Sequence, residues 1–144
     1  MALVLALACA FAFAPPSLVE AAGTNPEPFK AKLVDNAQLA ARLAATLSSM
    51  AHKPAPRGLS AEQRKGWDEQ TRWLGDASAR FAAMKKSMDA VLAKTKVSPS
   101  EMVQTNLQFA QQRDATETES HKYETVAPAC RERAAAAIAA LKGS

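Results

Sequence analysis

The chain has 144 residues, a net charge of +4 at pH 7 and only 6% aromatic residues. This length suits one ordinary domain with its own core. Basic and acidic side chains are interspersed along most of the chain, which is typical of a solvated helical surface and argues against a nucleic-acid partner. Few glycines and many alanines favour helix, so composition predicts an all-helical domain with a small, alanine-rich core.

The first predicted element is an export signal. Residues 3–14 are all apolar. This run is too short to cross a bilayer, which needs about 20 apolar residues, and it has the length of a signal-peptide core. Small residues at Val19 and Ala21 form a cleavage site, so we expect residues 1–21 to be a signal peptide. The usual basic residues before the core are missing, which leaves a retained membrane anchor, a lipoprotein signal at Cys9 and a start further upstream as alternatives.

Export decides which cysteine remains in the mature chain. Cleavage after Ala21 removes Cys9 and leaves Cys130 alone, in a periplasmic or secreted location. Because Cys130 lies on an apolar stripe, a buried thiol is the first expectation. The alternative is an intermolecular disulfide through Cys130. No Cys-x-x-Cys pair that could hold zinc or haem occurs in the sequence.

The first helix follows a flexible lead-in over residues 22–28, and residues 29–144 are expected to form a single helical domain. We predict this helix from Phe29 to His52, because its apolar residues recur in alternating steps of three and four, as in helices packed at a shallow angle. Asn36 is the polar member of this stripe. It is a candidate for fixing the register of the bundle, and the alternative is a partly exposed position.

The second helix starts after a turn with two prolines at residues 53–59. Ser60 and Gln63 have the capping-box spacing, and the helix should reach Lys94. Residues 59–63, Leu-Ser-Ala-Glu-Gln, are also similar to the Leu-Thr-x-x-Gln element of periplasmic helical stress chaperones. That resemblance covers five residues, has serine in place of threonine, and implies a hooked helical hairpin that holds unfolded clients.

Two glycines interrupt this second helix. Gly66 and Gly75 each lower its intrinsic helix propensity by about 1 kcal/mol relative to alanine. We therefore expect them to let a neighbouring helix approach closely.

The third helix is predicted to run without interruption from Pro99, capped by Ser98, to Leu141. Its middle is polar, so a break near Asp114 is the alternative. No glycine or proline stands between Pro99 and Pro128, which favours a continuous helix with a kink at Pro128.

Together these elements predict an all-α, coiled-coil-like, three-helix antiparallel bundle. The second and third helices form a long hairpin, and the shorter first helix covers one end. Residues 85–112 would then form a bare hairpin with an exposed apolar flank, and such flanks mark interaction sites. The candidate interaction surface consists of Met84, Met88, Val91, Met102 and Phe109, with the basic residues Lys85, Lys86, Lys94 and Lys96. These lysines serve solubility or contact an anionic envelope surface.

Side chains that could carry chemistry are few. Glu117 and Glu124 lie on the same side of a helix as His121, which favours an ion-pair face over a metal site because the acids fall off the apolar stripes. No nucleophile stands in pattern with a base, and no glycine-rich phosphate loop occurs. We therefore predict no catalytic, metal-binding or cofactor-binding residue.

The sequence thus predicts an exported, non-enzymatic helical protein that acts by protein–protein interaction in the cell envelope, as a chaperone-like or structural module. Its partner would be another protein or a second copy of the chain. The alternative is a periplasmic bundle that binds a small ligand, haem or a metal.

Overall fold

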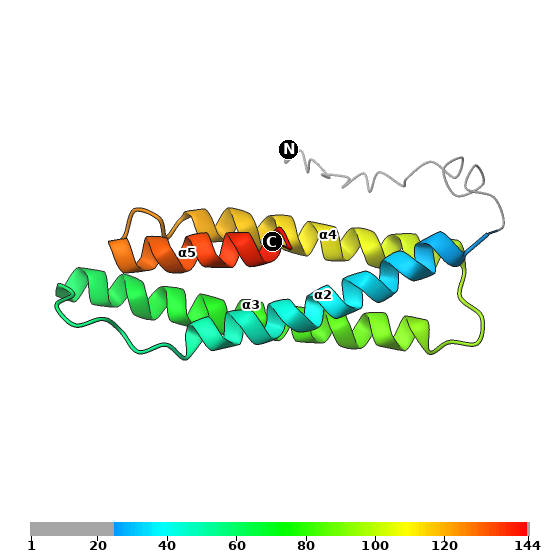
Figure 1. Ribbon diagram of the computed structural model, residues 1–144, viewed down its shortest axis with the longest axis horizontal. Helices are drawn as coiled ribbons and strands as arrows, with labels where there is room; N and C mark the ends of the chain where they lie inside the picture. Colours follow the sequence, from blue (N-terminus) through cyan, green and yellow to red (C-terminus); the bar gives the residue numbers. More distant parts are fainter. Residues whose placement is uncertain (1–24, 144) are drawn as a thin grey trace, which may run out of the picture.

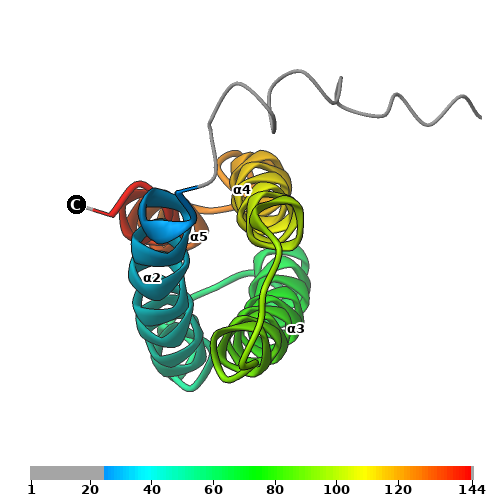
Figure 2. The ribbon, with the colours of Figure 1, turned by 90° about the vertical axis from the view of Figure 1, so that its right-hand side faces the viewer.

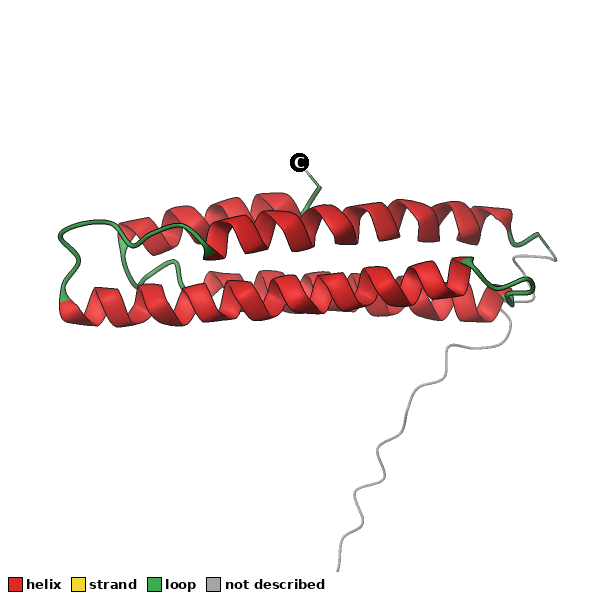
Figure 3. Ribbon diagram, turned by 90° about the horizontal axis from the view of Figure 1, so that it is seen from below, coloured by secondary structure: helices red, strands yellow, loops and turns green. Residues whose placement is uncertain are grey.

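The computed structural model describes residues 25–143, in which four helices and no strand occur (Figure 1, Figure 3). They are α2 (Glu27–Ala51), α3 (Ala61–Leu92), α4 (Pro99–His121) and α5 (Pro128–Leu141). The all-α prediction is confirmed, whereas the single third helix is two helices. The predicted signal peptide and Cys9 lie outside the described residues. Within residues 25–143, no helix combines the length and apolar character needed to cross a bilayer.

The helices form an elongated bundle in which α3 and α4 run antiparallel (Figure 1). Viewed along the bundle, α2 and α5 lie on one side, and α3 and α4 lie on the other (Figure 2). On this side, α2 and α5 each pack along a different part of α3. α2 lies along the C-terminal part of α3, and α5 lies along its N-terminal part, so the two meet only near the middle.

The segment between α2 and α3 determines this division. Pro54 and Pro56 restrict their own φ angles and keep the residues before them extended. Gly58 has φ +81°, a left-handed conformation that favours glycine. Ala55 and Leu59 pack on the cluster around Trp67, near the start of α3. The segment therefore runs back along α3 instead of turning sharply.

This path moves the end of α2 along α3. Arg133 donates to the carbonyl of Met50, at the end of α2, and to Thr71 Oγ1, so Met50 lies near Thr71 and not near the start of α3. Further along, Ser78 Oγ donates to the carbonyl of Ala44 at 2.6 Å. The first helix thus covers the end of the hairpin that the sequence predicted to be bare, at residues 85–112.

The predicted apolar interaction surface is consequently part of the core. Met88, Val91, Met102 and Phe109 are each at most 8% exposed, and Met84 is half-buried. The expectation of a bare hairpin with these residues exposed is wrong, because the extended path of residues 52–60 brings α2 over them.

Asn36 contributes a polar contact to this core. It is 6% exposed, and its Nδ2 donates to Asn106 Oδ1 on α4 at 2.9 Å. Asn106 Nδ2 in turn donates to the carbonyl of Phe29 at 3.3 Å. This pairing supports the interpretation that Asn36 fixes the register of α2 against α4, because a shift of either helix would leave the buried amide of Asn36 unpaired.

The chain reverses between α4 and α5. Ala127 has φ −159° and ψ 157°, the extended conformation that a following proline favours. Pro128 then takes the first position of α5, where its missing N–H leaves no helical hydrogen bond unmade. Ser120 Oγ donates to the carbonyl of Ala134 at 3.2 Å, so α5 packs back on α4. The predictions of a continuous helix kinked at Pro128 and of a break near Asp114 are both wrong.

The start of α3 follows the predicted capping box. The Gln63 N–H donates to Ser60 Oγ, and the Ser60 N–H donates to Gln63 Oε1, both at 3.1 Å. This local helix start accounts for the conformation of the five residues that resemble the chaperone element.

Gly66 is the glycine that a neighbour approaches. A Cβ atom on Gly66 would overlap Val126 Cγ1 in the α4–α5 turn, whereas a Cβ atom on Gly75 would meet no atom within 4 Å. The predicted close approach therefore holds at Gly66, where the neighbour is a turn and not a helix, and fails at Gly75.

We expect Gly66→Ala to lower the free energy of unfolding by about 1–3 kcal/mol, because overpacking a tight contact outweighs the gain in helix propensity. Gly75→Ala is the matched control in the same helix and should raise it by about 0.5–1 kcal/mol. Urea unfolding followed by circular dichroism measures both. In the Val126→Ala background, Gly66→Ala should lower the free energy of unfolding much less than it does in the unsubstituted chain. Equal effects of the two glycine substitutions would contradict the close approach.

Candidate functional site

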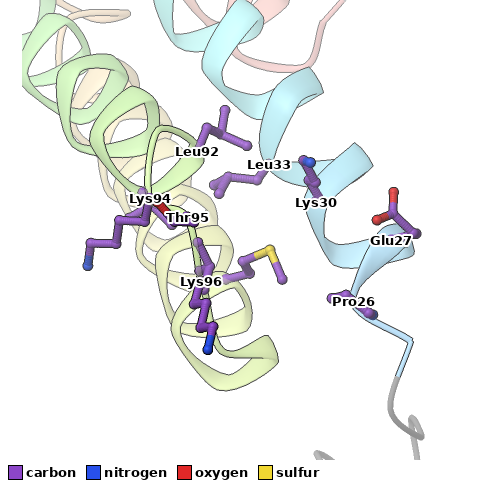
Figure 4. Close-up of a pocket in the computed structure, with 11 residues that line it drawn as sticks. Pro26, Glu27, Lys30, Leu33, Leu92, Lys94, Thr95 and Lys96 are labelled. Carbon is purple, nitrogen blue, oxygen red and sulfur yellow. The ribbon is translucent and has the colours of Figure 1, made fainter.

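A cavity of about 290 Å³ opens at one end of the bundle, between the start of α2 and the turn that joins α3 to α4 (Figure 4). We call it the end cavity. Its lining includes the buried residues Leu33, Val91 and Met102 and the half-buried residues Leu92 and Val97. These side chains give the end cavity an apolar floor.

Charged side chains surround this floor. Lys30 comes from α2, and Lys94 and Lys96 come from the turn after α3. In Figure 4, Lys30 and the two turn lysines stand on opposite walls, with Leu33 between them. Glu27 is the one acid in the lining, so the lining carries three positive charges and one negative charge.

The rim lysines differ in their ion pairs. Lys94 Nζ contacts Glu101 Oε1. Neither Lys30 nor Lys96 forms an ion pair with another side chain of residues 25–143. Two exposed ammonium groups at the mouth are therefore available to a ligand.

The start of α2 adds to the positive potential here. Pro26 is the N-cap residue and offers no side-chain acceptor, while the Glu27 N–H donates to Asn25 Oδ1 at 3.1 Å. N–H groups in the first turn of a helix present partial positive charge. The end cavity thus combines an apolar interior with a positive mouth. It can take up an apolar group from water.

The basic residues singled out from the sequence fall into two groups. Lys94 and Lys96 line the end cavity. Lys85 contacts Asp89 on the surface of α3, and Lys86 is exposed on the same helix. Sequence reasoning missed Lys30, because it placed the first helix over the opposite end of the hairpin.

A second open surface is a groove lined by α3 and α4 alone. It consists of two adjoining hollows of about 540 and 390 Å³, which share Arg80, Gln112 and Ala115. Met84 lies in one hollow. Trp73 lines the other, and its Nε1 is buried without a hydrogen-bond partner in the described residues. We call this surface the α3–α4 groove.

Arg133 forms the most extensive polar network of the described residues. It is 5% exposed, and its guanidinium Cζ lies 3.4 Å from the centroid of the Trp67 ring. Nε donates to Gln70 Oε1 at 3.0 Å. The other N–H groups donate to Thr71 Oγ1 and to the carbonyls of Met50 and Trp67, at 3.0–3.3 Å.

Burial lowers the pKa of Arg133 to about 10, so the side chain stays charged at neutral pH. No local pattern predicts this role, because Arg133 lies beside the apolar stripe of Cys130 and Ala134. A basic residue next to a stripe usually points to solvent.

Cys130 lies next to this network. Its side chain is fully buried, and its carbonyl accepts a hydrogen bond from Gln70 Nε2 at 2.9 Å. Burial raises the pKa of the thiol, which lowers the thiolate fraction at neutral pH and disfavours a nucleophilic role. An intermolecular disulfide through Cys130 would require the bundle to open, so the structure gives that alternative no support.

His121 lies in a network of surface charges. Its Nδ1 lies 2.8 Å from Glu124 Oε1, and its Nε2 lies 3.9 Å from Glu117 Oε1. Lys142 Nζ also pairs with Glu117, at 3.2 Å. These contacts match the predicted ion-pair face. No group of three or more His, Cys, Asp or Glu side chains within residues 25–143 is arranged to hold a metal ion.

No protein-family model, curated protein or solved structure matches this chain. Functional conclusions therefore rest on the chemistry of its own residues.

We expect Arg133→Lys to lower the free energy of unfolding by about 2–4 kcal/mol, because one ammonium group cannot satisfy acceptors on two other helices. Arg131 is the matched control, since it is exposed and donates only to the nearby carbonyl of Glu124. Arg131→Lys should change stability by about 0.5 kcal/mol or less. Urea unfolding of both variants measures the difference, and equal losses would show that the buried network contributes nothing specific.

Proposed function

We propose that this chain is an exported, non-enzymatic helical module that binds a small apolar ligand in the end cavity. The observation that carries the proposal is the cavity itself, with about 290 Å³ of space above an apolar floor. Small-molecule sites are commonly concave, apolar and provided with a few polar groups at defined places. The enclosed thiol of Cys130 supports a non-enzymatic role, since the nucleophile is withheld from solvent.

Export is the part of this proposal that rests on sequence alone. The apolar run over residues 3–14 and the small residues before the cleavage site at Ala21 support a periplasmic or secreted location. The mass of the mature N-terminus would separate a cleaved signal from a retained anchor.

Binding of a neutral probe tests the cavity. The fluorescence of 1-naphthylamine, a neutral probe with eleven heavy atoms, should change and saturate at about one probe per chain, as expected for transfer from water to one apolar site. Val97→Phe enlarges a half-buried lining residue and should weaken binding by about tenfold, because one added ring removes much of the free volume. Leu107→Phe is the control, since Leu107 is 45% exposed on α4 and lies outside the lining. An unchanged probe signal, or equal effects of the two substitutions, would contradict the proposal.

The α3–α4 groove favours a second candidate function, which is protein–protein interaction as a chaperone-like or structural module. Half-buried Met84 gives this surface an adaptable apolar contact. Trp73 supplies an aromatic face and a buried N–H that lacks an acceptor within residues 25–143. The occupant of the groove would be a protein partner or a second copy of the chain.

Size-exclusion chromatography with light scattering tests self-association. On this second candidate, the mass should exceed that of a monomer and should not change with reductant, because Cys130 is enclosed. Met84→Lys should shift the protein towards monomer by placing a charge in the apolar contact. Lys86→Gln, on the same helix outside the groove, is the control. A monomer at every concentration, or a dimer that reductant dissociates, would contradict an interaction between copies through the groove.

A further inference from the structure

We infer that the end cavity selects an anionic amphiphile, namely a free carboxylate with an unbranched apolar chain of about eight carbons. This inference rests on the proposed function and adds the chemical class of the ligand. It draws on the charge around the mouth, the chemistry of the floor and the volume between them.

The charge of the mouth favours an anion. Three lysines and one glutamate line the cavity, and Lys94 is paired with Glu101 next to it, so these five groups leave a net charge of +1 (3 − 2). Lys30 and Lys96 stand on opposite walls, and neither is paired with a carboxylate within the described chain. A ligand carboxylate at the mouth would be attracted by both ammonium groups, whereas a cation would be repelled.

The direction of the lysines places the charged group at the mouth. Figure 4 shows Lys94 and Lys96 extending outward from the turn, away from the apolar floor. Their long, flexible stems reach a group at the rim. The deeper residues Leu33, Val91 and Met102 are at most 8% exposed and offer only apolar side-chain surface. The ligand must therefore carry its charge at one end and its apolar chain at the other.

The volume favours a short apolar chain. A cavity of about 290 Å³ equals the liquid volume of roughly ten water molecules at about 30 Å³ each. A methylene group takes up a similar volume, so the cavity suits a ligand of about ten heavy atoms. Octanoate, with eight carbons and two oxygens, has this size, whereas a lipid with two long chains does not fit.

Calorimetric titration of the purified protein with three ligands of equal chain length tests the inference. At low salt, octanoate should bind about tenfold or more tightly than octanol, and octylammonium should bind more weakly than octanol. The preference for octanoate should shrink as sodium chloride is added, because salt screens exposed charges.

Substitutions at the rim locate the preference. Lys30→Gln with Lys96→Gln should weaken octanoate much more than octanol and so remove most of the octanoate preference, because the apolar floor is intact. Glu27→Gln should act in the opposite direction and tighten octanoate about two- to fivefold, as expected for one exposed charge. Lys86→Gln removes the same charge from α3 outside the lining and should have no effect. All four positions are exposed, so the variants keep the fold.

The outcomes separate this inference from the proposed function. Octanol binding as tightly as octanoate, with the neutral probe still bound, would overturn the inference and leave the proposed function standing. Absence of binding by the probe, octanol and octanoate would overturn both. Equal losses in the double lysine variant and in Lys86→Gln would show unspecific attraction and overturn the inference. So would binding to phosphatidylglycerol vesicles without binding of monomeric octanoate, which would point to a membrane surface instead.

Discussion

The relative positions of α2, α3 and α5 depend on the guanidinium group of Arg133. Removing a charged group from water is costly unless its donors are satisfied. Here the N–H groups meet acceptors from two other helices, and the planar group lies against the Trp67 ring. Because these acceptors are fixed to the turns of α2 and α3, α5 can dock in one register only. Neutral dipoles and an aromatic face supply these contacts of the guanidinium group, and the charge of Asp68 also favours its charged form.

The partial charge at the C-terminus of a helix explains why a buried arginine is favourable here. The last turn of α2 contains no basic residue, and neither does the last turn of α5. The carbonyls at a helix C-terminus carry partial negative charge, which a nearby cation stabilises. Arg133 supplies this cation to α2 from α5. Arg113 on α4 supplies it to α5, since its Nε donates to the carbonyl of Leu141 at 2.8 Å. Each of these helices is therefore completed by an arginine from another element.

Local patterns in the sequence predicted the elements well. The alternating stripe identified buried positions such as Leu33 and Leu74, and the capping residues Ser60 and Ser98 begin α3 and α4 as expected. The arrangement of the elements depended on contacts that no local pattern records. The packing of Ala55 and Leu59 on the Trp67 cluster moves α2, and the reversal before Pro128 separates α5. The end cavity shares this dependence, because it exists only where α2 meets the turn after α3. The clustering of Lys94 and Lys96 in the sequence was enough to single them out. Lys30 lies near them only because the path of residues 52–60 brings α2 to this end of the bundle.

Both tryptophans lie in the same half of the bundle, so tryptophan fluorescence reports on that half and not on the other. Trp67 contacts Arg133 of α5, and the Trp73 ring lies 5.5 Å from that of Tyr123 in the turn before α5, so both indoles lie in the half of the bundle that contains α5. Val91, in the end cavity, follows Trp73 by 18 residues on α3, or about 27 Å along the helix axis. Intrinsic emission therefore reports whether α5 is in place and carries no direct signal from the opposite end. Comparing emission with far-ultraviolet ellipticity during unfolding would distinguish detachment of α5 from loss of the whole bundle.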